Sequence, residues 1–221
     1  MLKNIWYRLR NLLYPPKCVL CKTVLPKEQL DLCHTCRTEA PAFTFSKKQL
    51  PYILGTVSVW FYKDHVRQSV LRYKFGRYRH YAHNYGRLLA MRVLTDLDGE
   101  FDLVTWVTPS IRRQLKRGFD HGRKLAKAVS TELELPLRRT LTKAVHNPPQ
   151  SASASAAQRR ANVLGAYKPF RKRRIIGQRI LLIDDVVTTG STASECAKIL
   201  MLCGAKSVHL ATVAATEHQK K

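Results

Sequence analysis

Apolar and polar residues follow their clearest pattern near the end of the printed sequence. Four apolar residues, 180–183, lead into two acids, and a turn rich in hydroxyl groups follows over 188–192. Small and apolar residues then recur at helical spacing from Ala193 to Cys203, and Gly204 is placed to end that helix. A second apolar run comes next. This succession of strand, helix and strand predicts a β-α-β unit, and therefore a parallel sheet flanked by helices.

Shorter patterns on the amino-terminal side predict the rest of the same domain. Residues 55–62 and 101–110 have the composition of strands, and the second ends in a turn. Apolar residues recur at helical spacing over 63–73 and again over 125–133. Residues 147–158 are small and low in complexity, which predicts a mobile loop. We therefore expect one α/β domain over residues 53–216.

The first 15 residues are amphipathic and end at two prolines. They predict a short helix, 1–15, which we expect to dock on the main body, with membrane attachment as the alternative. No apolar run in the chain is long enough to cross a bilayer, and no small-residue cleavage site follows the apolar start. We expect a soluble cytoplasmic protein without membrane insertion.

Residues 16–40 contain four cysteines in two C-x2-C pairs. Thiolates paired in this way can complete a tetrahedral shell around Zn²⁺. Such a segment is too small to have a core of its own, so bound metal would supply much of its stability. We predict a structural zinc finger over 16–40, with His34 outside the shell and with these ligands: Cys18, Cys21, Cys33 and Cys36.

Aromatic and basic residues alternate between 73 and 85. Rings interleaved with cations suit single-stranded nucleic acid, which they bind by stacking and by phosphate pairing. A partly buried helix with a basic outer face would have the same composition. We favour the helix and leave the nucleic-acid interpretation open.

The formal net charge is +24, and it is unevenly distributed. Between Val107 and Arg179, eighteen Lys or Arg residues stand against three acids, which gives +15. A binding site for a small anion needs only a few cations, so this excess favours a nucleic-acid backbone as a partner. The candidate DNA-binding residues are Arg112, Arg113, Lys116, Arg117, Arg171, Lys172, Arg173 and Arg174.

Asp184 and Asp185 end the predicted strand, and the turn that follows leads into a helix. Ligands of open parallel sheets gather at this edge. Backbone N–H groups of the turn, with the helix dipole, favour an anion, and Gly190 lets the backbone approach it. We expect Ser191 or Thr192 to cap the helix. A phosphate on the turn and hydroxyl groups on the acids together describe a ribose 5-phosphate.

The stretch "ILLIDDVVTTGST" resembles the signature that type I phosphoribosyltransferases use for 5-phosphoribosyl-1-pyrophosphate (PRPP). The four-cysteine segment, "KRGFDHGRKLA", "RRANVLGAY" and this signature occur in the order seen in the ComF (ComFC) family of competence-associated proteins. The resemblance covers residues 15–216. It implies a type I phosphoribosyltransferase-like fold with a zinc finger, and a role in DNA uptake during natural transformation beside a helicase-like ComF ATPase.

The resemblance also implies roles for individual residues. Asp184 and Asp185 would hold the ribose hydroxyls as the catalytic pair, and the turn would hold the 5′-phosphate. Residues 107–110 would form the pyrophosphate loop, with Mg²⁺ bridging pyrophosphate and ribose oxygens, and residues 147–162 would be the hood loop. The implied PRPP-binding residues besides the two acids are Thr108, Arg159, Arg160, Thr188, Thr189, Gly190, Ser191 and Thr192.

The chain departs from the family pattern at two positions. It has Trp106-Val107-Thr108-Pro109 where V-P-V-P is common, and Asp120 where R-G-F-N is usual. Thr188 stands where the family can place a base toward a purine, and a threonine is not a useful base near neutral pH. We therefore expect a PRPP-binding protein that also binds single-stranded DNA. The alternative is an active phosphoribosyltransferase that acts on a nucleobase or other small acceptor, with no direct role in DNA handling.

Overall fold

A computed structural model describes residues 15–26, 28–44, 49–76, 78–110, 114–115, 118–144 and 165–217 of the 221-residue chain. The predicted helix over 1–15 lies outside these ranges except for its last residue. The predicted loop over 147–158 lies wholly outside them.

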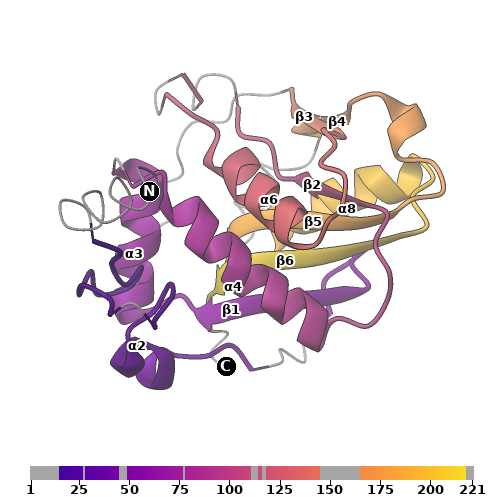
Figure 1. The fold of residues 1–221 in the computed structure, drawn as a ribbon. Coiled ribbons are helices and arrows are strands. Elements are labelled where there is room, and N and C mark those ends of the chain that lie inside the picture. Colours follow the sequence, from indigo (N-terminus) through magenta and orange to yellow (C-terminus); the bar gives the residue numbers. More distant parts are fainter. Residues whose placement is uncertain are drawn as a thin grey trace, which may run out of the picture.

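Four parallel strands form the centre of the molecule (Figure 1). They are β1 (Gly55–Phe61), β2 (Leu103–Trp106), β5 (Arg179–Val187) and β6 (Ser207–Ala215), in the order β1-β6-β5-β2. Asp184 of β5 pairs with Thr212 of β6. The predicted β-α-β unit and the parallel sheet are confirmed.

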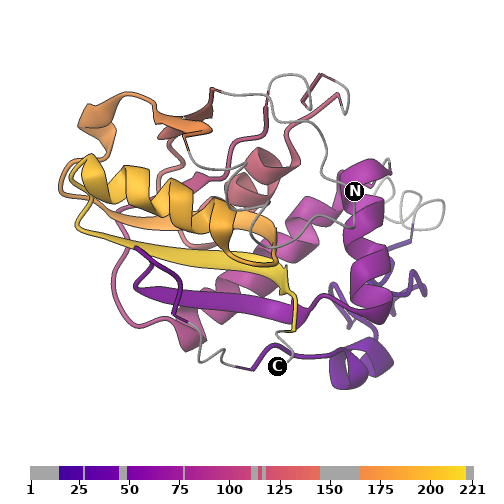
Figure 2. The same ribbon diagram turned by 180° about the vertical axis from the view of Figure 1, so that it is seen from behind.

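Helices cover both faces of the sheet. Helices α4 (Tyr81–Asp96) and α6 (His121–Glu132) pack on one face, and α8 (Ser191–Leu202) packs on the other, as the view from behind shows (Figure 2). Helix α3 (Asp64–Phe75) follows β1 and stands at the end of the sheet. Because neighbouring residues of a strand point to opposite faces, β5 contributes to two cores. Leu181 and Ile183 join the core under α4 and α6, whereas Ile180 and Leu182 join the core under α8.

Smaller elements extend the domain beyond strand β2. An antiparallel pair, β3 (Leu141–Lys143) and β4 (Tyr167–Pro169), is followed by the 3-10 helix η1 (Lys172–Arg174). Buried hydroxyl groups link this region to the sheet, since Thr105 and Thr140 are hydrogen-bonded at 2.7 Å. The pair therefore sits at a fixed place against the sheet edge.

The four-cysteine segment shares its core with the sheet. Cys18, Val19 and Leu20 are fully or almost fully buried in the core that also holds Tyr73 and Tyr85. The segment also contains the short helix α2 (His34–Glu39). Asp31 lies between the two cysteine pairs and binds helix α4, where Asn84 Nδ2 donates to it at 2.6 Å and Arg87 forms an ion pair. The segment is therefore attached to the main body by apolar packing and by charge.

Most of the aromatic rings between 73 and 85 are core residues. Tyr73, Tyr81 and Tyr85 are buried, and the rings of Tyr73 and Tyr85 meet edge to face at 5.6 Å. Phe75, at the end of α3, is 67% exposed. The favoured interpretation, a partly buried helical region, is confirmed for the three tyrosines, so their rings are not available for stacking on nucleic acid.

Candidate functional site

Asp184 and Asp185 lie at the carboxyl end of β5 and differ in their surroundings. Side chains alternate along a strand, so Asp184 continues the α8 face and Asp185 continues the face covered by α4 and α6. The Asp184 side chain is partly exposed, whereas Asp185 is buried. Two adjacent acids therefore occupy two different environments.

Both carboxylate oxygens of Asp185 are occupied by basic side chains. Lys74 Nζ, from the last turn of α3, lies 2.9 Å from Oδ1, and His121 Nε2, from the first turn of α6, lies 3.1 Å from Oδ2. Burial by itself would raise the pKa of Asp185, but the charge of Lys74 and the hydrogen bond from His121 outweigh it and hold the pKa below its ordinary value. Asp185 is therefore a charged, fixed acid.

Asp184 has no basic side chain bonded to it among the residues that the structure describes. Its Oδ1 accepts the backbone N–H of Asp185 at 2.8 Å. Burial, followed by the charge of Asp185, raises the pKa of Asp184 to about 7. An acid that is held close to its neutral form gains most from a ligand that donates hydrogen bonds or brings a cation.

The turn after β5 is built around Gly190. Its φ of 78° lies in the left-handed region, and an added Cβ would come within 2.3 Å of Leu50 Cδ2. Gly190 is also the N-cap of α8 and offers no capping side chain; the nearest substitute is Thr189 Oγ1, which accepts the backbone N–H of Ser191 at 3.4 Å. The prediction that Ser191 or Thr192 caps it is therefore wrong. Thr189 and Ser191 instead hydrogen-bond each other through their hydroxyls at 2.8 Å.

The two departures from the family pattern are in contact. Trp106 Nε1 donates to Asp120 Oδ2 at 3.0 Å, and Asp120 Oδ1 accepts the backbone N–H of Arg123 at 2.9 Å. Asp120 is thus the N-cap of α6 and the partner of the indole. A carboxylate accepts on both oxygens, which an asparagine does not, so Trp106 explains why an acid stands at this position.

Thr108, in the predicted pyrophosphate loop, is buried, and its hydroxyl has no hydrogen-bond partner among the described residues. It lines a cavity of about 390 Å³ between the end of β2, the start of α6 and strand β3. Four cations line the same cavity: Arg123, Arg139, Lys143 and Arg174. Lys143 also lies close enough to Asp184 to act on its charge. The cavity is thus suited to an anion.

The remaining predicted residues are divided between two groups. Thr188 to Thr192 lie together at the turn, beside the two acids. Arg171 to Arg174 lie apart from them, around η1. The other predicted residues fall outside the described residues, and they are Arg159, Arg160, Arg112, Arg113, Lys116 and Arg117.

The four cysteine sulfurs lie within 4.8 Å of one another. Cys21 Sγ and Cys33 Sγ are 3.6 Å apart, and sulfurs at about 2.3 Å from a tetrahedral Zn²⁺ are separated by about 3.8 Å. None of the six cysteines is in a disulfide. The geometry therefore fits the predicted structural zinc with four thiolate ligands and no open position.

Lys74 and His121 are site residues that the sequence pattern did not indicate. Lys74 is one cation in the aromatic and basic stretch, and His121 belongs to "KRGFDH", for which no role followed from the residues. A buried acid requires a basic partner. Asp185 was therefore a signal that such partners exist, but it did not say where in the chain they lie.

Residues 120–221 match the family described as "Phosphoribosyl transferase domain", and residues 9–47 match the family described as "Double zinc ribbon domain". The chain therefore joins an amino-terminal double zinc ribbon to a phosphoribosyltransferase domain with a parallel four-stranded sheet. This combination, predicted from the cysteine pairs and the acidic strand end, is confirmed.

Two relatives match this chain over different shares of its length. "DNA utilization protein YhgH" of Escherichia coli (strain K12) is 27% identical over 194 residues, which cover 86% of this chain and 82% of that protein. "Competence protein F" of Haemophilus influenzae is 31% identical over 99 residues, which cover 44% of this chain and 43% of that protein. Among solved structures, glutamine PRPP amidotransferase from B. subtilis matches 64% of this chain and 30% of its own, with 20% identity and a TM-score of 0.44.

Within the described residues, no helix is both long and apolar enough to span a bilayer.

Proposed function

We propose that the carboxyl edge of the sheet binds PRPP with Mg²⁺. The observation that carries this proposal is the arrangement at the end of β5, where a partly exposed carboxylate stands beside a turn whose glycine admits a close ligand. Asp184 would accept the ribose hydroxyls, and backbone N–H groups of the turn 188–192 would hold the 5′-phosphate. Asp185 would complete the pair from its fixed position.

The pyrophosphate group of PRPP would lie toward the cationic cavity. The hydroxyl of Thr108, which has no partner among the described residues, could donate to its oxygens, and Lys143 would add positive charge beside them. Carboxylate and phosphate oxygens are the ligands that Mg²⁺ prefers, and the bound ion would neutralise charge on the pyrophosphate. The phosphoribosyltransferase domain supports this ligand class. Whether an acceptor is then phosphoribosylated depends on a second substrate.

Titration calorimetry with PRPP and Mg²⁺ tests this proposal. We expect wild-type protein to bind and Asp184→Asn to bind at least about tenfold more weakly, because an amide is a poorer acceptor for ribose hydroxyls. Asp98→Asn, at an exposed acid after α4, is the matched control and should bind like wild type. Absence of binding by wild type, or equal affinities for wild type and Asp184→Asn, contradicts the proposal.

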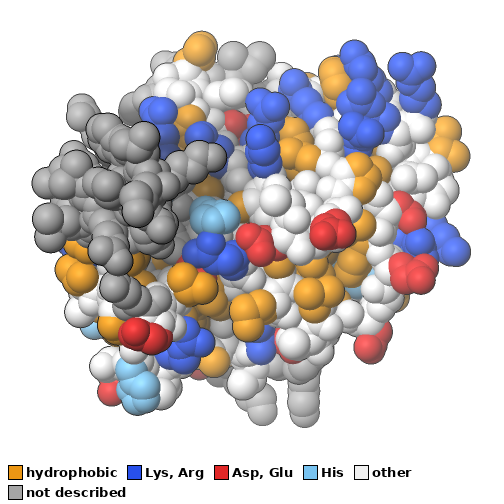
Figure 3. Space-filling model, viewed as in Figure 1, with side chains coloured by type: hydrophobic (Ala, Val, Ile, Leu, Met, Phe, Trp, Pro, Cys, Tyr) orange, Lys and Arg blue, Asp and Glu red, His pale blue; other side chains and the backbone are white. Residues whose placement is uncertain are grey.

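We also propose that the region around β4 and η1 binds single-stranded DNA. The guanidinium groups of Arg139 and Arg171 lie 4.8 and 5.5 Å from the centre of the Phe170 ring, which is partly exposed. Lys and Arg side chains gather at this end of the molecule (Figure 3). Rings between cations are typical of proteins that bind single strands by stacking and phosphate pairing.

Two further features of this region support an anionic partner. The pKa of Arg174 is lowered, first by desolvation and then by the like charges of Arg171, Arg138 and Arg173. Arg171 has a φ of 54°, which is unusual for a residue other than glycine. Crowded like charges oppose folding in the absence of a counter-charge, and a phosphate backbone supplies one. Backbone strain of this kind is frequent at functional sites.

Fluorescence anisotropy with a labelled single strand tests the DNA proposal. We expect affinity to fall steeply between about 50 and 200 mM salt, with a logarithmic slope of about −0.7 for each phosphate contact. Arg171→Gln should reduce the magnitude of that slope, whereas Arg67→Gln, at an exposed position on α3, should not. An affinity that does not depend on salt, or equal slopes for both variants, refutes the proposal.

By the names of its relatives, we propose that the protein acts in DNA uptake during natural transformation. A helicase-like ATPase is the partner we propose for that process.

A further inference from the structure

We propose that the four-cysteine segment is a remote support of the ligand site: it fixes helix α3, and Lys74 of that helix is the positioning residue that holds Asp185. This inference rests on the proposed PRPP site and assigns a role in it to the zinc ribbon. Lys74 would act through Asp185 without touching the ligand itself.

The first link joins the cysteine segment to α3. Val19 and Leu20 lie between the two cysteines of the first pair, and their backbone carbonyls accept hydrogen bonds from the helix. Ser69 Oγ donates to the carbonyl of Val19, and Arg72 Nη2 donates to that of Leu20. Ser69 is fully buried and also bonds Tyr85 at 2.6 Å. The backbone that carries two thiolates is thus bonded directly to two consecutive turns of α3.

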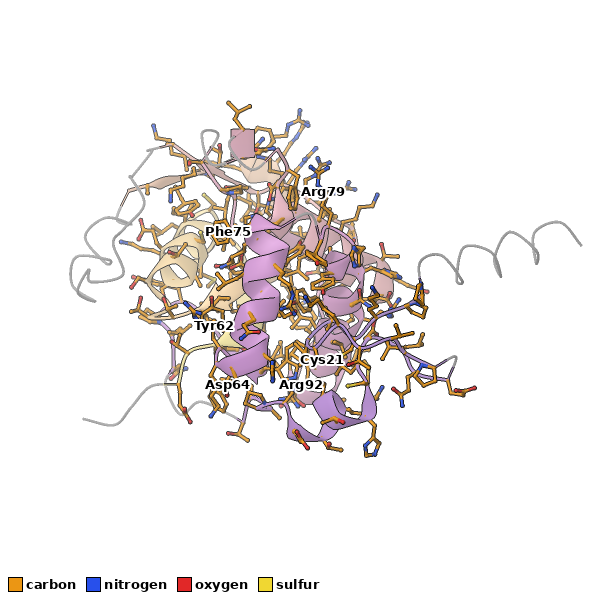
Figure 4. The ribbon with its side chains drawn as sticks, turned by 90° about the vertical axis from the view of Figure 1, so that its left-hand side faces the viewer. Cys21, Tyr62, Asp64, Phe75, Arg79 and Arg92 are labelled. Atoms are coloured by element: carbon orange, nitrogen blue, oxygen red, sulfur yellow. The ribbon has the colours of Figure 1, made fainter. Side chains whose placement is uncertain are left out.

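The second link joins α3 to the acids. Tyr73 donates its hydroxyl to the backbone carbonyl of His121 at 2.5 Å, and Lys74 Nζ lies 2.9 Å from Asp185 Oδ1. Tyr73 and Lys74 follow Arg72 directly in the helix. Figure 4 shows α3 from the side, between the labelled Asp64 and Phe75, with Cys21 beside it. One helix therefore contacts the cysteine segment and the ligand site within about 8 Å of its length, from Ser69 to Lys74.

The geometry of the four thiolates controls the first link. Bound Zn²⁺ would fix both turns of the segment, including the carbonyls of Val19 and Leu20. Without those acceptors, the buried hydroxyl of Ser69 and the guanidinium of Arg72 would lose hydrogen-bond partners. Helix α3 would then be held less firmly in its position. A small displacement of its last turn would move Lys74 out of ion-pair distance. Asp185 would then be a buried acid that lacks its main counter-charge.

Calorimetry on metal-loaded full-length protein, with PRPP and Mg²⁺ as the probe, tests this inference as a double-mutant cycle. We expect Lys74→Met to weaken binding about tenfold, and Lys74→Arg, which retains the charge, to recover part of it. Arg72→Met should weaken binding in the wild-type background and have little further effect in Lys74→Met, because both changes act through one contact. Arg67→Met, which removes an exposed cation from the same helix, should leave the affinity unchanged.

Zinc content, measured in every variant, separates this effect from metal loss, since Arg72→Met keeps all four thiolates. Additive effects of the two substitutions, or an unchanged affinity in Arg72→Met, overturn the inference. Hydrogen exchange gives a readout that does not require ligand: backbone amides of residues 184–190 should exchange faster in Arg72→Met than in Arg67→Met. Equal exchange in the two variants overturns the inference, whether or not wild type binds PRPP. Absence of PRPP binding by wild type refutes the proposed function instead.

Discussion

Asp184→Asn should change how stability depends on pH. In the folded protein the pKa of Asp184 is raised to about 7, whereas the ordinary value is 3.8. The folded state therefore holds this proton more firmly than the unfolded chain does, and wild-type stability should fall as pH rises from about 4 to about 7. The variant has no such proton, and its amide oxygen can still accept the N–H of Asp185.

The difference between the folded and unfolded pKa values of Asp184 corresponds to a free energy of about 4 kcal/mol. Solvent reaches part of Asp184, so we expect the variant to gain a smaller amount, between about 1 and 3 kcal/mol, above pH 8 relative to pH 4. Urea unfolding followed by tryptophan fluorescence, from pH 4 to 9, measures this difference. Curves that stay parallel for wild type and variant, or a variant less stable than wild type at pH 8, would refute the reasoning.

Asp102→Asn provides a control of opposite sign. Hydrogen bonds from Arg179 lower the pKa of Asp102 to about 2. This acid therefore contributes stability above pH 4 that is lost as pH falls toward 2. Its replacement should cost stability at neutral pH, on the order of 1 kcal/mol after screening by solvent, and this cost should shrink as pH falls through the folded-state pKa.

Three further substitutions test separate parts of the structure. Gly190→Ala should lose about 2 kcal/mol in urea unfolding, because its φ is positive and Leu50 occupies the space of the new Cβ; an unchanged midpoint would contradict this. Cys33→Ser should reduce zinc well below one per chain and lower the thermal midpoint of the whole domain, since segment and sheet share a core; loss of zinc alone would contradict the shared core. Asp120→Asn should cost about 1 kcal/mol because it places an amide donor against the indole N–H, and the cost should disappear in Trp106→Phe, as a double-mutant cycle of thermal unfolding would show.

The elements that the sequence predicted well are those with a local cause. The β-α-β unit follows from spacing within one continuous stretch, 179–215, and the cysteine cluster follows from two short pairs. The capping of α8 was predicted wrongly, although it is also local. Small hydroxyl residues near a helix start usually cap it, but here Gly190 takes a left-handed conformation against Leu50, which is distant in sequence.

The support of the acids could not be predicted, because its parts come from three separate elements. A buried Asp185 requires basic partners, but the chain contains 39 Lys and Arg residues, and the sequence does not indicate which of them these partners are. Only the packing of α3 and α6 on the sheet selects Lys74 and His121 from the candidates. The same packing decides that Asp185 faces these helices and that Asp184 faces α8. The sequence alone does not distinguish the two neighbouring aspartates in this way.

The position of β6 has a consequence for synthesis of the protein. This strand lies between β1 and β5 but follows both in the chain, so the edge of each strand that pairs with β6 has no partner when the strand leaves the ribosome. The roughly 150 residues between β1 and β6 take on the order of 10 to 30 s to translate, and β1 keeps an unpaired edge during this time. Strand β5 waits only for the short segment, 188–206, that separates it from β6. Nascent chains stopped before residue 207 should therefore aggregate or bind chaperones, whereas release of the complete strand lets the sheet close at its centre.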